Sequence, residues 1–104
     1  MNALENKFDA EMINIYKVAK KEIGYNASRF LQLINEVGGY KAAKMLIVKD
    51  DGTYGFQKLW EHKRLDLSVE AHVLKPEFEE LFTVEERNMC RKRLAEYGFK
   101  IWTK

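Results

Sequence analysis

The chain has 104 residues and a net charge of +2, with 46% hydrophobic and 33% charged residues. This composition is typical of a globular domain and does not indicate disorder. The charges are too evenly balanced to indicate nucleic-acid binding by themselves. The single cysteine, Cys90, excludes an intramolecular disulfide and any metal site built from several cysteines. We therefore expect one domain that covers residues 1–104.

The sequence carries no sign of membrane insertion or export. No apolar run reaches the roughly 18 residues that a membrane-spanning helix needs. The first residues, MNALENKFDAEM, are acidic where a signal peptide has a basic segment and an apolar core. Together with the lone cysteine, these observations predict a cytoplasmic protein that does not contact membranes.

Apolar residues at three- and four-residue steps predict a helix over residues 4–23, which Gly24 ends. Its apolar stripe is Leu4, Phe8, Met12, Ile15, Tyr16, Ala19 and Ile23. A second helix follows, capped by Asn26 or Ser28 and ended by the pair Gly38 and Gly39. Its apolar stripe is Ala27, Phe30, Leu31, Ile34 and Val37.

The next segment, YKAAKMLIV (residues 40–48), predicts a shorter helix. A turn signal comes directly after it, in the run Asp50-Asp51-Gly52-Thr53. One alternative is a hairpin that pairs residues 45–48 with residues 54–56. We favour a helix after the turn, because Phe56, Leu59 and Trp60 have helical spacing.

The stretch RLDLSVEAHVLKPEF (residues 64–78) predicts a junction between two short helices. Asp66 or Ser68 caps the first helix, and Pro76 suits the first position of the second. We expect Arg64 to hold the junction by bonding to Asp66 or Glu70. The carboxylates and the proline are then packing and capping residues.

Thr83 followed by Glu86 fits a capping box and predicts a last helix over residues 84–97. Its buried residues would be Cys90, Leu94 and Tyr97. The tail that follows alternates in polarity, which predicts a short extended segment. The fold class is therefore all-α: a small orthogonal bundle of about six to seven short helices.

Ser68 and His72 stand four residues apart near Glu70, which suggests a small hydrolase as one hypothesis. Against it, no glycine-rich elbow surrounds the serine, and an N-cap role needs fewer assumptions. The two histidines and Cys90 lack the spacing of zinc ligands. We therefore expect no catalytic residue, no metal and no cofactor.

Basic residues outnumber acidic ones between residues 41 and 64, by six to three. They are Lys41, Lys44, Lys49, Lys58, Lys63 and Arg64. Two short helices separated by a turn suggest a helix-turn-helix, although the connection is longer than usual. A second basic cluster, Arg87, Arg91, Lys92 and Arg93, lies on the last predicted helix. The plainer interpretation is that these side chains form solvated helix faces.

Aromatic residues are numerous for such short helices, and some of them are expected to remain on the surface. The candidates are Tyr54, Trp60, Phe99 and Trp102. Aromatic side chains commonly anchor protein interfaces, so these four predict a surface for a protein partner or a second copy of the chain.

A longer pattern links these segments. It consists of Gly38-Gly39 with Ala42-Ala43-Lys44-Met45-Leu46, Gly55-Phe56 with Leu59-Trp60-Glu61, the run RLDLSVEA with Leu74, Leu81-Phe82-Thr83 with Glu85-Glu86, and Arg93-Leu94 with Tyr97-Gly98-Phe99. Over this span the chain resembles a small helical domain that recurs in bacteria and phages. The resemblance implies a stand-alone prokaryotic or phage domain and transfers no site.

The leading hypothesis is a non-catalytic protein-interaction module, whose partner is another protein or a second copy of the chain. The alternative is a nucleic-acid-binding domain that uses the basic residues between 41 and 64. The third hypothesis is the hydrolase around Ser68 and His72.

Overall fold

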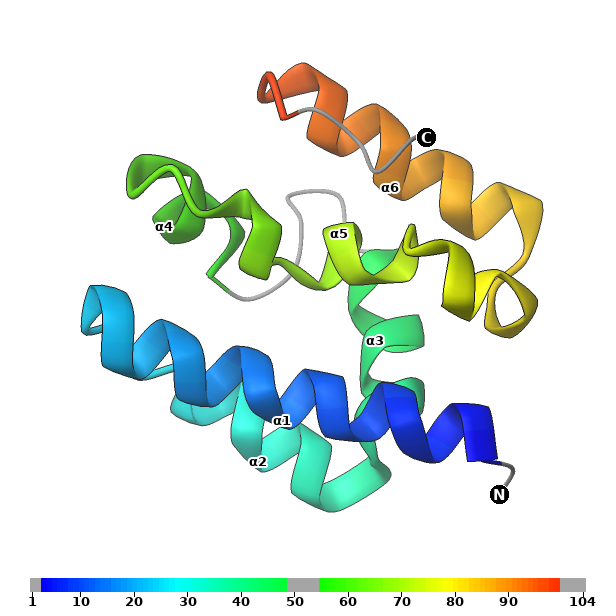
Figure 1. The fold of residues 1–104 in the computed structure, drawn as a ribbon, viewed down its shortest axis with the longest axis horizontal. Helices are drawn as coiled ribbons and strands as arrows, with labels where there is room; N and C mark the ends of the chain where they lie inside the picture. The colour runs from blue at the N-terminus through cyan, green and yellow to red at the C-terminus, as the bar shows by residue number, and fades with distance from the viewer. Residues whose placement is uncertain (1–2, 49–54, 100–104) are drawn as a thin grey trace.

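The computed structural model describes residues 3–48 and 55–99, and this part contains helices and no strand (Figure 1). Six α-helices and two 3₁₀ helices follow one another along these described ranges. They are α1 (Ala3–Ile23), α2 (Ser28–Val37), α3 (Gly39–Ile47), α4 (Phe56–Glu61), η1 (Leu65–Leu67), α5 (Val69–Val73), η2 (Pro76–Leu81) and α6 (Val84–Glu96). The predicted all-α bundle of short helices is confirmed. The predicted extended tail lies outside the described residues.

The helices form a small bundle in which the first and last α-helices lie on opposite sides. Helices α1 and α2 run side by side, α6 lies across the molecule from them, and α5 with η2 fills the space between (Figure 1). Helix α3 crosses behind and contacts α1, α2, α5 and α6. None of the helices in the described ranges is both long and apolar enough to cross a bilayer.

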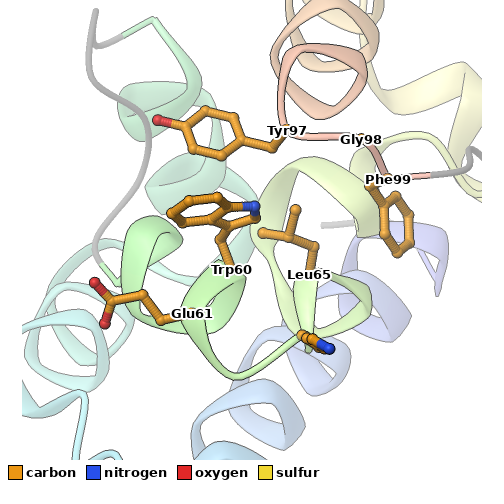
Figure 2. Close-up of a pocket in the computed structure, with 7 residues that line it drawn as sticks. Trp60, Glu61, Leu65, Tyr97, Gly98 and Phe99 are labelled. Atoms are coloured by element: carbon orange, nitrogen blue, oxygen red, sulfur yellow. The ribbon is translucent and has the colours of Figure 1, made fainter.

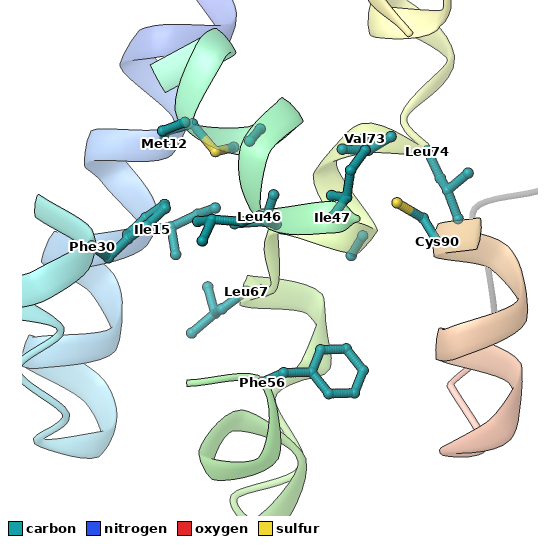
Figure 3. Packing of buried hydrophobic residues seen from close by; sticks show 14 of the residues in the cluster. Met12, Ile15, Phe30, Leu46, Ile47, Phe56, Leu67, Val73, Leu74 and Cys90 are labelled. Carbon is teal, nitrogen blue, oxygen red and sulfur yellow. The ribbon is translucent and has the colours of Figure 1, made fainter. Parts of the chain in front are cut away.

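One hydrophobic cluster connects the helices. Figure 3 shows Met12 of α1, Phe30 of α2 and Leu46 of α3 on one side of it, with Val73 of α5 and Cys90 of α6 on the other. All five side chains are buried. Apart from Leu31, the stripes predicted for the first two helices face this core, because residues three and four apart share one face of a helix.

The start of α2 differs from the prediction that Asn26 or Ser28 caps it. The N-cap is Ala27, which has no capping side chain, and Ser28 is already the first helical residue. The Asn26 side chain is engaged elsewhere, since its Oδ1 accepts a hydrogen bond from the Tyr16 hydroxyl at 2.9 Å. Asn26 therefore does not cap α2, because its side chain bonds to α1 instead.

Helices α1 and α3 approach closely at Gly39, which begins α3 one residue earlier than predicted. A Cβ built at Gly39 would stand 2.8 Å from the Cα of Asp9. The Asp9 carboxylate accepts a hydrogen bond from the backbone N–H of Tyr40 at 2.7 Å, which satisfies a donor in the first turn of α3. The second glycine of the pair is thus a contact point between two helices as well as a restart.

The hairpin alternative is wrong in the part of the chain that the structure describes. Residues 45–47 belong to α3, and Phe56 begins α4. Both segments use helical spacing to bury Leu46, Ile47, Phe56 and Leu59. The predicted turn at residues 50–53 lies outside the described residues.

The capping box at the start of α6 is confirmed. The backbone N–H of Glu86 donates to Thr83 Oγ1 at 3.1 Å, and Thr83 N–H donates to Glu86 Oε1 at 2.9 Å. At the other end, Tyr97 was expected in the core but is 38% exposed. The reason is that α6 ends at Glu96, so the helical stripe of Cys90 and Leu94 does not continue to residue 97.

Candidate functional site

The junction at residues 64–78 is built by capping, and Ser68 rather than Asp66 is the cap. Ser68 Oγ accepts a hydrogen bond from Ala71 N–H at 3.1 Å and donates one to the Leu65 carbonyl at 2.7 Å. Asp66 lies inside η1. As predicted, Pro76 takes the first position of the next helix, which is a 3₁₀ helix.

Arg64 holds the junction through Asp66, and it also reaches a distant helix. Its Nε and Nη2 donate to the two Asp66 carboxylate oxygens at 3.0 and 3.1 Å, a bidentate pair. Its Nη1 bonds to Glu22 of α1. Hydrogen bonds from Arg64 to Asp66 and Glu22 raise the pKa of the guanidinium above its already high usual value.

Glu70 is not a partner of Arg64, which corrects the second half of that prediction. The Glu70 side chain is fully buried, and its Oε2 lies 2.9 Å from Nη1 of Arg93 on α6. The same Nη1 donates to the backbone carbonyl of Ile47, the last residue of α3, at 3.2 Å. Arg93 was predicted on a solvated face, but its side chain is only 13% exposed and joins α3, α5 and α6.

The Ser68 and His72 side chains do not contact each other in the way a hydrolase requires. His72 Nδ1 lies 2.9 Å from the backbone carbonyl of Ser68, while the Ser68 hydroxyl is occupied by Leu65 and Ala71. A serine nucleophile needs its hydroxyl hydrogen-bonded to the base. The geometry of this pair therefore gives the hydrolase hypothesis no support.

The His72 ring is buried between α5 and α1. Because Nδ1 must donate to a carbonyl, the neutral ring carries its lone pair on Nε2, which stands 3.4 Å from Glu11 Oε1. That oxygen also accepts a bond from Lys75 Nζ at 3.0 Å. Burial lowers the pKa of His72, and the bond to the Ser68 carbonyl and the Glu11 charge oppose this only in part.

The basic residues predicted to bind nucleic acid are in different situations. Lys44 pairs with Glu86 at 3.1 Å and lies over the Tyr40 ring, and Arg64 is engaged as described. Lys41, Lys58 and Lys63 are exposed, and Lys49 lies outside the described residues. Two of the six side chains, Lys44 and Arg64, thus form ion pairs within the fold.

Two of the four aromatic candidates, Trp60 and Phe99, line one hollow together with Tyr97. Trp60 is 44% exposed and Tyr97 is 38% exposed, and their ring centroids lie 5.3 Å apart in an edge-to-face contact. Beside them opens a hollow of about 520 Å³. It is lined by Trp60, Glu61, Lys63, Leu65, Tyr97, Gly98 and Phe99, and we call it the aromatic hollow (Figure 2). Tyr54 and Trp102, the other two candidates, lie outside the described residues.

The hollow exists because the ends of two helices meet. Phe56 and Leu59 are buried and anchor α4, which turns Trp60 outward on the same short helix. At the end of α6, Tyr97 stacks edge to face on Phe56 with ring centroids 4.9 Å apart. Figure 2 shows Tyr97 next to Trp60, and Leu65 between Trp60 and Phe99.

Both helices end in the same way, with a Schellman motif. In α4, Lys63 N–H donates to the Trp60 carbonyl at 3.0 Å and Arg64 N–H to the Leu59 carbonyl at 2.7 Å. In α6, Gly98 N–H donates to Ala95 and Phe99 N–H to Leu94, both at 3.0 Å. The second motif turns Phe99 back toward the bundle, where it packs against the core.

Sequence reasoning selected Trp60 and Phe99 for this surface but missed Tyr97, which it placed in the core. Leu65 is a buried core residue that also lines the hollow. Lys63 was selected for a different function. A local signal for the missing tyrosine was present, because a glycine after Tyr97 marks the end of a helix and ends the buried stripe.

Comparisons with known proteins identify no relative of this chain. Neither a family model, nor a curated protein, nor a solved structure matches the chain. The resemblance to a recurrent bacterial and phage domain therefore stays a prediction.

Proposed function

We propose that this protein is a small interaction domain that binds an apolar segment of a protein partner in the aromatic hollow. The observation that carries the proposal is the pair Trp60 and Tyr97, two large aromatic side chains that are partly exposed and touch each other beside an open hollow. Partly exposed aromatics beside a concave surface are the usual anchors of protein interfaces.

The size of the hollow suggests what kind of segment it accepts. A volume of about 520 Å³ lies within the range of pockets that hold small ligands. A short segment with one or two apolar side chains fits this space. Leu65 and Phe99, which both line the hollow, supply the apolar contact that such side chains need.

The nucleic-acid alternative has less support from the described residues. Of the basic side chains that it relies on, Lys44 and Arg64 already form ion pairs. Binding to random duplex DNA that weakens steeply between 50 and 200 mM salt would favour it. Failure to bind duplex DNA at low salt would exclude it.

The proposal is tested by NMR titration of the ¹⁵N-labelled full chain with a neutral probe, acetyl-Trp-Gln-amide. We expect shifts at the Trp60 indole N–H and at the backbone N–H groups of Tyr97 and Phe99. The variant Trp60→Ser should lose these shifts, and Val84→Ser should keep them. Val84 is a suitable control because it is also an exposed apolar residue but begins α6, at the end far from the hollow.

The same variants test whether the partner is a second copy of the chain. A dimer mass by light scattering that falls to a monomer mass in Trp60→Ser, but not in Val84→Ser, would identify self-association through the hollow. Two results would contradict the proposal. One is chemical-shift changes spread over the whole chain, and the other is no change at the hollow at the highest soluble concentration of the probe.

A further inference from the structure

Lys63 has an unusual backbone conformation for its residue type. Its φ is +60°, and every other residue with positive φ in the described ranges is a glycine. This left-handed conformation brings a side chain close to the backbone and is unfavourable for residues with a Cβ. Strained positions that persist in a protein are a reason to look for function.

The end of α6 provides an internal comparison for this position. Gly98 takes the same place in the α6 Schellman motif that Lys63 takes in the α4 motif, and its φ is +79°. Both residues line the aromatic hollow. The fold thus uses the favoured glycine at one of the two helix ends and a lysine at the other.

The charges around the hollow leave the Lys63 ammonium available. Lys63 is exposed and has no ion pair with any residue in the described ranges, whereas the next residue, Arg64, is held by Asp66 and Glu22. The acidic residue that lines the hollow is Glu61. Figure 2 shows its carboxylate pointing away from Leu65 and Phe99.

We infer that Lys63 forms an ion pair with a carboxylate of the partner. The bound segment then carries an acidic side chain next to its apolar anchor. The inference rests on the proposed function and specifies its partner. An apolar anchor beside an acidic residue matches the apolar hollow and Lys63, the one basic side chain among the described residues that line it. A lysine in this position also interacts favourably with the end of α4, so the experiment must separate binding from folding.

Two probes that differ only in charge test the inference. Acetyl-Trp-Glu-amide and acetyl-Trp-Gln-amide are titrated separately into the full chain at low salt, and affinity is measured from the shifts of Trp60 and Tyr97. An exposed ion pair should make the acidic probe bind roughly two- to fivefold tighter. The ratio should fall to one in Lys63→Gly and persist in Lys63→Arg.

Lys58→Gln is the matched control, because Lys58 is an exposed lysine on α4 that does not line the hollow. Its ratio should equal that of the wild type. Equal affinity of both probes for the wild type, or an unchanged ratio in Lys63→Gly, would refute the role of Lys63 while leaving the hollow as a binding site. If neither probe shifts Trp60 or Tyr97, the proposed function itself fails.

Discussion

The buried ion pair between Glu70 and Arg93 should be one of the most sensitive points of the fold. Replacing Arg93 with methionine keeps much of the side-chain volume but removes the charge. It leaves a fully buried Glu70 carboxylate and the Ile47 carbonyl without this donor. Breaking one side of a buried pair costs about 3–5 kcal/mol, because the remaining charge loses its buried counter-charge.

This loss is large for a chain of 104 residues. Domains of this kind have unfolding free energies of about 5–15 kcal/mol, so Arg93→Met should remove a fifth or more of the total. In urea unfolding followed by circular dichroism, the midpoint should fall by at least about 1 M with an unchanged slope. The double variant Glu70→Leu/Arg93→Met should recover to within about 1–2 kcal/mol of the wild type, because no buried charge remains.

Arg87→Met is the matched control. Arg87 is also on α6 and its side chain is 18% exposed, but its nearest carboxylate oxygen, on Glu79, is 3.8 Å from Nη1. Its buried Nε has no hydrogen-bond partner among the described residues. We expect Arg87→Met to cost less than about 1 kcal/mol. If Arg93→Met also costs less than 1 kcal/mol, or if the losses of the two single variants add in the double variant, the reasoning is wrong.

Four further predictions concern single positions. Ser68→Ala should lower the unfolding free energy by about 0.5–2 kcal/mol in urea titrations, because a helix cap is lost. Burial lowers the pKa of His72 from its usual value of 6.5, so the unfolded state takes up more of this proton than the folded state as pH falls through 6.5. Stability should therefore drop there by at most about 1.4 kcal/mol per pH unit, and His72→Gln, unlike His62→Gln, should abolish the drop. Lys63→Gly should raise the melting temperature. Glycine removes the strain of the left-handed conformation, about 1 kcal/mol, and this gain exceeds the free-energy cost of the more flexible unfolded chain. A lower melting temperature would contradict this. Burial raises the pKa of Cys90 to about 12, so a thiol reagent should react at pH 8 only after unfolding.

The parts of the fold that could be predicted from the sequence are those determined within one or two turns of chain. The box joins Thr83 to Glu86, three positions apart, and the Ser68 cap joins Ser68 to Ala71 at the same separation, so each is present in the local sequence. The pairing of Arg64 with Glu22 joins residues 42 positions apart, and nothing in either segment specifies it. Long-range ion pairs depend on how helices pack, which a single sequence does not reveal.

The candidate site follows the same division. Trp60 and Phe99 could be selected because the chain has more aromatic residues than its short helices readily bury. That they line one hollow depends on α4 and α6 ending side by side, which is a property of the packed bundle. Tyr97 was misplaced because helical periodicity was extended by one residue past the point where α6 ends.

The contact of Gly39 with α1 has a consequence for how this sequence can change over time. Gly24 and Gly98 have nothing within 4 Å of an added Cβ, so asparagine, which tolerates the left-handed conformation, is an acceptable replacement at either position. At Gly39 the obstacle is the main chain of Asp9, at 2.8 Å, and no choice of rotamer removes it. In a saturation library selected for folding, position 39 should therefore return glycine alone, and a replacement there would require compensating changes along α1.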